Sequence, residues 1–138
     1  MGDDAEFTRA NAERRGTLAG TLNYMSPEMI SEAKATLSTD MWAFGCIIYK
    51  MITGKAAFPG IAPTTVYPRV QSRDITWPKG KDEINPSCRD LIEKLLALDL
   101  NERLGRPGTM KELYSHPFFA GIDFNQDLRE QLNIAHLL

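Results

Sequence analysis

The sequence predicts an all-α fold in which smaller helices pack around one buried central helix, at about residues 39–54. Three observations support this class: strand patterns are nearly absent, helix caps recur along the chain, and the 39–54 segment is apolar on almost every side. A helix that is apolar all round needs other elements to enclose it. The 138 residues, of which 43% are hydrophobic and 25% charged, suit one domain of ordinary size.

Charge and hydropathy exclude several classes of function. The chain has 16 Lys and Arg against 18 Asp and Glu, a net charge of -2, so we expect no nucleic-acid partner. The longest apolar run, residues 41–52, is too short to span a bilayer, which takes roughly 20 residues, and residues 1–6 do not resemble a secretory signal. The 2 cysteines make neither a disulfide framework nor a metal site. We therefore expect reduced thiols, no bound metal, no membrane segment and a cytoplasmic location.

Two stretches are predicted to be mostly irregular. Residues 1–23 are polar and lack apolar periodicity, so we expect a loop there. Residues 24–36 contain a short helix that begins at Pro27, because proline is tolerated in the first turn of a helix. Residues 55–84 carry several prolines and glycines, and we expect a mostly looped region with one short helix.

The central helix has clear start and stop signals. Ser38 or Thr39 can cap its start, and Asp40 lies in its first turn, where the helix dipole favours a negative charge. Gly54 occupies the position of a left-handed C-terminal cap. Asp40 is expected to be partly buried at the head of this helix, where a carboxylate needs partners.

Residues 85–138 return to helical patterning. Asn85 caps a helix whose first position is Pro86. Its apolar stripe consists of Leu91, Ile92, Leu95 and Leu96.

The last third of the chain also predicts two shorter helices. Thr109 and Glu112 are spaced as a capping box, and that helix must end before Pro117. Residues 124–138 carry apolar residues at helix-like spacing, so a terminal helix is expected.

Four short motifs suggest a family. They are GTLNYMSPE at residues 20–28, DMWAFG at 40–45, LDLNERLG at 98–105 and HPFF at 116–119. In this order and spacing they resemble the C-terminal half of a eukaryotic protein kinase domain. Residues 42–49 and 88–96 are most similar to the 3-phosphoinositide-dependent protein kinases of the AGC group.

The resemblance implies a division of the chain and a class of activity. Residues 1–120 correspond to part of a kinase domain, with an activation segment at 1–28 and a helical C-lobe at 29–120. Residues 121–138 form a C-terminal extension. The implied activity is ATP-dependent phosphorylation of serine or threonine in proteins, within intracellular signalling, with other AGC kinases as a possible substrate class.

The resemblance also assigns roles near the N-terminus. Thr17 matches the activation-loop phosphosite, where a phosphate would add about two negative charges. Gly20, Thr21 and Leu22, together with Tyr24, match the loop that receives the substrate residue after the phospho-acceptor. The Thr21 hydroxyl bonds the catalytic base and lysine in this family, which is an auxiliary role. The alternative for Thr17 and Thr21 is an ordinary loop threonine.

Three further residues match structural positions of the family. Glu28 closes the activation segment and pairs in the family with an arginine before the last helix, here Arg103. The alternative is that Glu28 and Arg103 are two solvated surface charges. Asp40 matches the aspartate that holds the backbone of the catalytic loop, which is a scaffolding role and not proton transfer.

The sequence contains no Gly-x-Gly-x-x-Gly and no His-Arg-Asp. The resemblance implies ATP and Mg²⁺ for the complete kinase, and we expect this chain alone to bind neither and to be inactive. A missing kinase N-terminal half is then an expected partner. Without it, Met41, Trp42 and Tyr24 are expected to form an exposed patch, and Asp40 to turn to water. The alternatives are a kinase-derived binding module without phosphoryl transfer, or a truncated gene-model fragment.

Residues 63–73 cover the position of the family's helix G, a docking surface in many kinases. Pro68 falls inside this segment, and a proline costs about 3 kcal/mol in a helix interior. We therefore expect either that the helix starts at Tyr67 or Pro68, or that the segment is bent.

Overall fold

The computed structural model describes residues 22–127 of the chain. Its elements are η1 (Leu22–Tyr24), α2 (Pro27–Glu32), α3 (Leu37–Thr53), α4 (Pro63–Ser72), η2 (Gly80–Asp82), α5 (Pro86–Leu95), α6 (Met110–Tyr114) and η3 (Pro117–Phe119). These residues form no strand, so the all-α prediction is confirmed. The predicted site residues Thr17, Gly20 and Thr21 lie outside the described residues.

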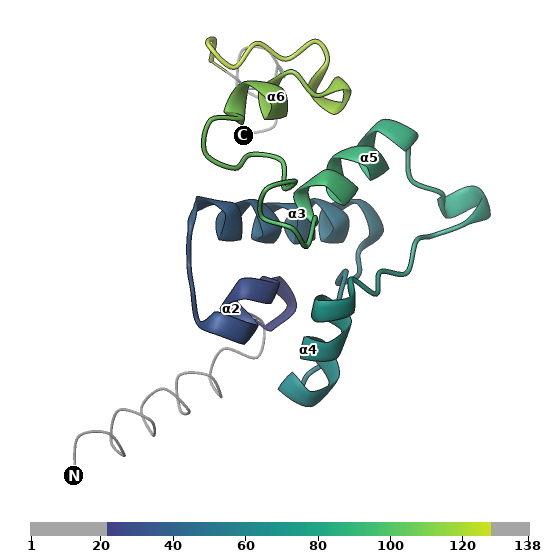
Figure 1. Cartoon of the computed structure of the whole chain (residues 1–138). Helices are drawn as coiled ribbons and strands as arrows, with labels where there is room; N and C mark the ends of the chain where they lie inside the picture. Colours follow the sequence, from purple (N-terminus) through teal and green to yellow (C-terminus); the bar gives the residue numbers. More distant parts are fainter. Residues whose placement is uncertain (1–21, 128–138) are drawn as a thin grey trace.

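Helix α3 crosses the middle of the molecule and organises the rest. In Figure 1, α5 packs on its upper side, and η1 and α2 lie below it with α4. The helices α6 and η3 sit at the top, where η3 contacts α5. Two sides of α3 are therefore covered by separate layers of helix.

The hydrophobic core lies along α3, between these layers. Trp42 of α3 is fully buried, and its ring stacks on Phe58 with the centroids 5.4 Å apart. On the other layer, a Cβ on Gly45 would lie 2.9 Å from Leu96 Cδ2. Glycine at position 45 is thus what allows α3 and the end of α5 to approach so closely.

The start of α3 differs from the prediction. The N-cap residue is Thr36 and not Ser38 or Thr39, although Thr39 takes part in the capping box of this helix. The Thr39 hydroxyl accepts a hydrogen bond from the backbone N–H of Thr36 at 3.0 Å, from the third helical position. At the other end the prediction is confirmed, because Gly54 has a φ of 73° and its N–H donates to the Lys50 carbonyl at 2.8 Å.

Helix α4 runs through Pro68, so the first of the two expected alternatives, a start at Tyr67 or Pro68, is wrong, and the second, a bent segment, stays a prediction. It starts at Pro63, where a proline loses no helix hydrogen bond. Val66 and Val70, one turn apart, are fully buried against the core. Their burial compensates for the backbone hydrogen bond that Pro68 cannot make.

The C-terminal helices bear out one prediction and correct two. Helix α5 has the predicted Asn85 cap, whose side chain accepts from the N–H of Ser87 at 2.9 Å. The predicted capping box at α6 is wrong, because the Thr109 hydroxyl turns back and donates to the Arg106 carbonyl at 2.9 Å. Residues 124–127 form a turn and not the start of a helix, and the rest of that predicted helix lies outside the described residues.

Helix α3 is the buried central helix that the sequence predicts, but its cover is incomplete. Ile47 is 44% exposed and Met51 is 78% exposed, so a third face of the helix is open. The expected exposed patch differs too, because Trp42 is fully buried. Asp40 is exposed, as expected for a carboxylate that turns to water and not for one partly buried at the helix head.

Both cysteines are free thiols inside the core. Burial raises the pKa of Cys46 to about 12, and it also raises the pKa of Cys88. Within the described residues, no helix has both the length and the hydropathy required to cross a membrane.

Candidate functional site

A buried ion pair joins α2 to the loop that follows α5. Arg103 is fully buried and Glu28 is 6% exposed. The contact is bidentate: Nη1 of Arg103 donates to Oε1 of Glu28 at 2.7 Å, and Nη2 donates to Oε2 at 3.1 Å. The two residues are 75 positions apart in the chain, so this pair joins two segments that are distant in the sequence. Glu28 and Arg103 are thus not two solvated charges.

Additional hydrogen bonds satisfy most of the remaining polar atoms of the pair. Arg103 also donates from Nη1 to the Ser38 carbonyl at 2.8 Å and from Nε to the Ala97 carbonyl at 2.9 Å. The Thr39 hydroxyl donates to Oε1 of Glu28 at 3.0 Å. We call Glu28, Arg103, Thr39 and the Ser38 carbonyl the anchor. It fixes α2, the start of α3 and the loop after α5 in one arrangement.

The electrostatics of the anchor favour a charged Glu28. Burial alone would raise the pKa of this carboxyl, but the hydrogen bond from Arg103 is the largest of the opposing effects, and the net pKa is lowered. The Arg103 guanidinium also lies 5.1 Å from the centroid of the Trp42 ring, within cation–π range. The pair is therefore ionised inside the fold.

The described part of the predicted substrate loop is η1 and the residues after it. Leu22 is buried and Tyr24 is half-buried. In the orientation that satisfies both polar atoms of its amide, Asn23 donates to the carbonyls of Phe58 and Gly60 at 3.0 and 3.2 Å. Ser26 caps α2 by accepting from the N–H of Met29 at 3.3 Å. This loop is thus fixed on the core from both ends.

The structure brings together some predicted site residues and separates others. Glu28 and Arg103 are in contact, and Leu22 and Tyr24 belong to the element that leads into α2. Asp40 lies one position after Thr39, which reaches Glu28, but its exposed side chain is not part of the anchor.

The sequence did not predict the long-range hydrogen bonds that Thr39 and Asn23 make within the protein. Thr39 was expected to serve a local cap, and its contact with Glu28 crosses 11 positions. A short polar side chain at the third helical position carries no signal of such a contact. Asn23 sits inside a matched motif, but its partners on the 58–60 loop are visible only in the fold.

A second polar cluster, also missed, lies between α5 and η3. Oδ2 of Asp90 is 2.7 Å from Nε2 of His116 and 2.8 Å from Nζ of Lys94. Because Nδ1 of His116 accepts from the N–H of Phe118, the ring proton is assigned to Nε2. Hydrogen bonds from Lys94 and then His116 hold the pKa of Asp90 below its usual value. This cluster fastens η3 to the fold.

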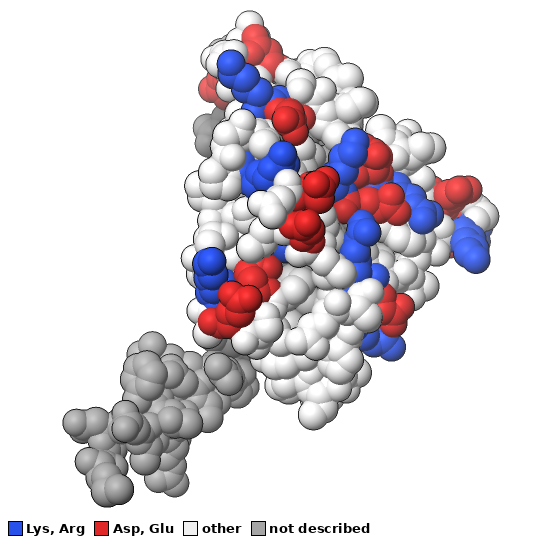
Figure 2. Space-filling model, in the orientation of Figure 1, with Lys and Arg blue, Asp and Glu red and all other residues white. Residues whose placement is uncertain are grey.

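A hollow lies away from the anchor. A cavity of about 780 Å³ lies at the C-terminal end of α3, lined by Tyr49, Ile52, Lys55 and Lys79 among others. None of the predicted site residues lines it. On the face shown in Figure 2, acidic and basic side chains are interspersed, with no stripe of one sign.

The expectation that this chain alone binds neither ATP nor Mg²⁺ stays a prediction. Among residues 22–127, no group of three or more His, Cys, Asp or Glu side chains could hold a metal ion. The sequence also has no glycine-rich loop to cover phosphates.

Comparison with known proteins identifies the class. Residues 5–119 match the protein kinase domain family. The chain therefore belongs to this family, and the family generally uses ATP and Mg²⁺ and acts on proteins.

The similar curated proteins are serine/threonine kinases. The chain is 39% identical over 115 residues to the probable serine/threonine-protein kinase pdkA of Dictyostelium discoideum, a match that covers 81% of this chain and 16% of that protein. It is 34% identical over 126 residues to 3-phosphoinositide-dependent protein kinase 1 of Arabidopsis thaliana, covering 88% and 24%. It is 36% identical over 107 residues to the serine/threonine-protein kinase greatwall of Danio rerio, covering 78% and 12%. The chain thus spans a quarter or less of the length of each of these relatives.

Proposed function

We propose that this chain is the activation segment and substrate platform of a serine/threonine protein kinase. The observation that carries the proposal is the anchor. It joins Glu28, at the end of the proposed activation segment, to Arg103 through two buried hydrogen bonds. A buried bidentate pair of this kind fixes the loop that precedes Glu28, which is where a protein substrate would lie.

Several roles within this platform are part of the proposal. Leu22 and Tyr24, with Gly20 and Thr21, would contact the residue that follows the phospho-acceptor. Thr17 would be phosphorylated to order the segment. The half-buried position of Tyr24 and the fixed backbone of η1 support the substrate-contact role.

The nucleotide would be held by a partner, the ATP-binding half of a kinase domain. Asp40 is exposed at the head of α3 and is available to hold backbone N–H groups of that half. The substrates would be proteins in the cytoplasm, with other AGC kinases as the substrate class. The chain alone is then expected to transfer no phosphate.

Mapping the 5′ end of the transcript tests the proposal. In-frame codons upstream of residue 1 that encode His-Arg-Asp and Asp-Phe-Gly would support it. A transcript that starts just before the Met1 codon, with no such sequence, would instead favour the kinase-derived binding module. Transfer of phosphate from ATP to a serine or threonine peptide by the purified 138 residues would overturn the assignment of the nucleotide site to a partner.

A further inference from the structure

The N-cap of η3 is a histidine whose two ring nitrogens have different partners. Nδ1 of His116 accepts a hydrogen bond from the backbone N–H of Phe118 at 3.1 Å, and Nε2 donates to Oδ2 of Asp90 on α5 at 2.7 Å. Histidine is the side chain whose charge ordinarily changes between about pH 5 and 8. The bond from Phe118 needs the lone pair on Nδ1, which exists only while the imidazole is neutral.

The contacts of His116 are internal to the described part of the chain. Its side chain is 4% exposed, and both of its ring nitrogens have partners on α5 and η3. They do not depend on an open surface, so a neighbouring domain that covers the molecule would leave them in place.

The same turn occurs earlier in the chain with a cap that does not change charge. Both Asn85 and His116 directly precede a proline. Oδ1 of Asn85 accepts from the N–H of Ser87, two positions on, at 2.9 Å. The backbone angles agree, with φ −49° and ψ 133° at Asn85 and φ −59° and ψ 139° at His116. Asparagine therefore fits this turn, and its amide oxygen remains an acceptor when the pH changes.

A proton on His116 acts oppositely on the two contacts. The charged groups that face or adjoin this residue are Asp90 and Lys94 of α5, Glu102 and Arg106 of the loop before α6, and Glu112 of α6. Helix η3 itself has no charged side chain. A proton taken from solvent adds to Nδ1, which then faces the N–H of Phe118 with a second donor, so that hydrogen bond breaks. The contact of Nε2 with the Asp90 carboxylate becomes stronger. The ring therefore stays on α5, and η3 loses its cap.

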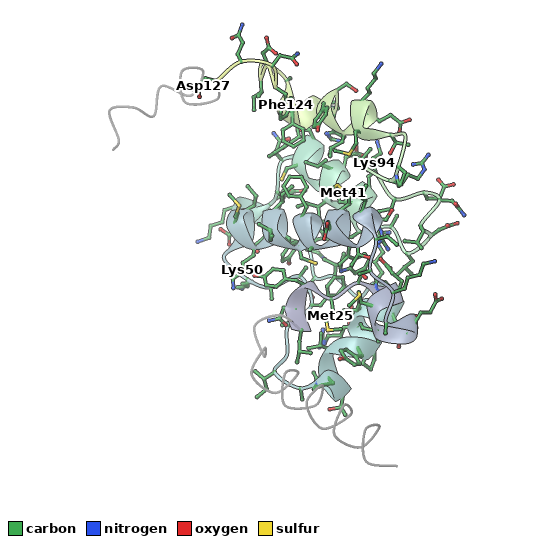
Figure 3. All side chains as sticks on the ribbon, turned by 90° about the vertical axis from the view of Figure 1, so that its left-hand side faces the viewer. Met25, Met41, Lys50, Lys94, Phe124 and Asp127 are labelled. Carbon is green, nitrogen blue, oxygen red and sulfur yellow. The ribbon has the colours of Figure 1, made fainter. Side chains whose placement is uncertain are left out.

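The segment that depends on this cap extends beyond η3. Phe118 and Phe119 are partly buried against the core. Their rings meet edge to face at 5.1 Å, and the Phe119 ring meets that of Phe124 in the same way at 5.5 Å. In Figure 3, Lys94 of α5 and Phe124 both lie in the upper part of the molecule, on the same side of α3. Loss of the cap thus loosens residues 117–124 together.

We propose that His116 is a proton-sensitive cap. While neutral it holds η3 on α5, and when it takes up a proton at mildly acidic pH it releases residues 117–124. The proposal goes beyond the proposed function, and it involves neither the nucleotide nor the anchor.

Hydrogen exchange of backbone amides in the 138-residue chain, followed by NMR, tests the cap. The measured quantity is the protection factor, which is corrected for the intrinsic effect of pH on exchange. Between about pH 7.5 and about pH 5.5, the protection factor of the Phe118 amide should fall roughly fivefold or more, because a hydrogen bond is lost. The Ser87 amide, which Asn85 caps, should keep its protection and is the internal control.

Three variants identify the group that takes up the proton. His116→Asn keeps an acceptor of the Asn85 kind without the charge change, so the protection of Phe118 should be equal at both pH values. Asp90→Asn removes the neighbouring carboxylate and should still show the loss, which excludes Asp90 as the titrating group. His136→Asn changes the other of the 2 histidines and should behave as the unaltered chain does.

The unaltered chain supplies a second measurement that does not depend on a variant folding. Nitrogen NMR shifts of the His116 ring should show a proton on Nε2 alone at about pH 7.5 and on both nitrogens at about pH 5.5. The Phe118 amide signal should change over the same pH interval. A proton on Nδ1 alone at neutral pH, a Phe118 protection factor that does not change, or an equal loss of protection in His116→Asn would each overturn the proposal.

Discussion

Two ion-pair regions of this molecule use similar side chains in opposite surroundings. In the anchor, Arg103 and Glu28 have side-chain exposures of 0% and 6%, and backbone carbonyls accept the spare guanidinium hydrogens. In the cluster on α5, Lys94 and Asp90 are 55% and 47% exposed. Water can replace either partner in the second region but not in the first. Breaking the anchor should therefore destabilise the fold much more than breaking the exposed pair on α5.

Removing one partner of the anchor should produce the largest effect. Glu28→Ala leaves the Arg103 guanidinium buried without its carboxylate, which is expected to lower the free energy of unfolding by about 3–5 kcal/mol. Urea unfolding followed by circular dichroism measures the change. A variant that is unfolded without denaturant also agrees with this expectation, whereas a loss under about 1 kcal/mol would place the anchor in the same class as a surface pair.

The contact between Thr39 and Glu28 should have the next largest effect. Thr39→Val keeps the shape of the side chain but removes the hydroxyl that bonds the carboxylate at 3.0 Å. A hydrogen bond to a charged group contributes roughly 1.5–3 kcal/mol, so unfolding should occur at a lower urea concentration. Thr65→Val, on the exposed side of α4, is the matched control and should be nearly neutral.

Acidification should destabilise the fold through both regions. The pKa values of Glu28 and Asp90 are lowered in the fold, so each carboxylate stabilises the fold at pH values above its unfolded pKa. That stability is lost as the pH falls below about 4 and through the folded pKa of each group. The melting temperature should fall as the pH is lowered from neutral to about 3. Asp90→Asn should remove only a small part of this decrease. A melting temperature that rises on acidification would contradict both assignments.

The smallest effect should come from the exposed partner on α5. Lys94→Ala removes an exposed ion pair between positions four apart on a helix, and such pairs contribute about 0.3–0.5 kcal/mol. The change should shrink further in concentrated salt, because exposed charges are screened. A loss as large as that of Glu28→Ala would mean that the two regions do not differ as described.

Local sequence signals predicted most of the helices. Asn85 with Pro86, and Gly54 at the end of α3, act within a few residues of the helix ends that they define, so their chemistry is readable from the sequence. The errors arose where distant residues decide. Thr39 is not the N-cap residue of α3, and its hydroxyl contacts the distant Glu28 as well as the N–H of Thr36. Helix α4 continues through Pro68 because Val66 and Val70 are buried by the rest of the chain.

The candidate site was only partly readable for the same reason. The partner of Glu28 came from the family resemblance, since nothing in the composition of either segment links positions 28 and 103. The roles of the Ser38 and Ala97 carbonyls have no sequence signal at all, because every residue has a carbonyl. The open face of α3 was missed because its apolar residues could equally have been buried.

The buried thiol of Cys46, in the middle of α3, is unreactive while the protein is folded. Because the pKa of Cys46 is about 12, almost none of this thiol is ionised at neutral pH, and the surrounding residues bury it. Once the layers around α3 separate, the same sulfur regains an ordinary acidity and reacts with alkylating reagents. The rate at which an alkylating reagent labels Cys46 therefore reports how often the helices around α3 separate.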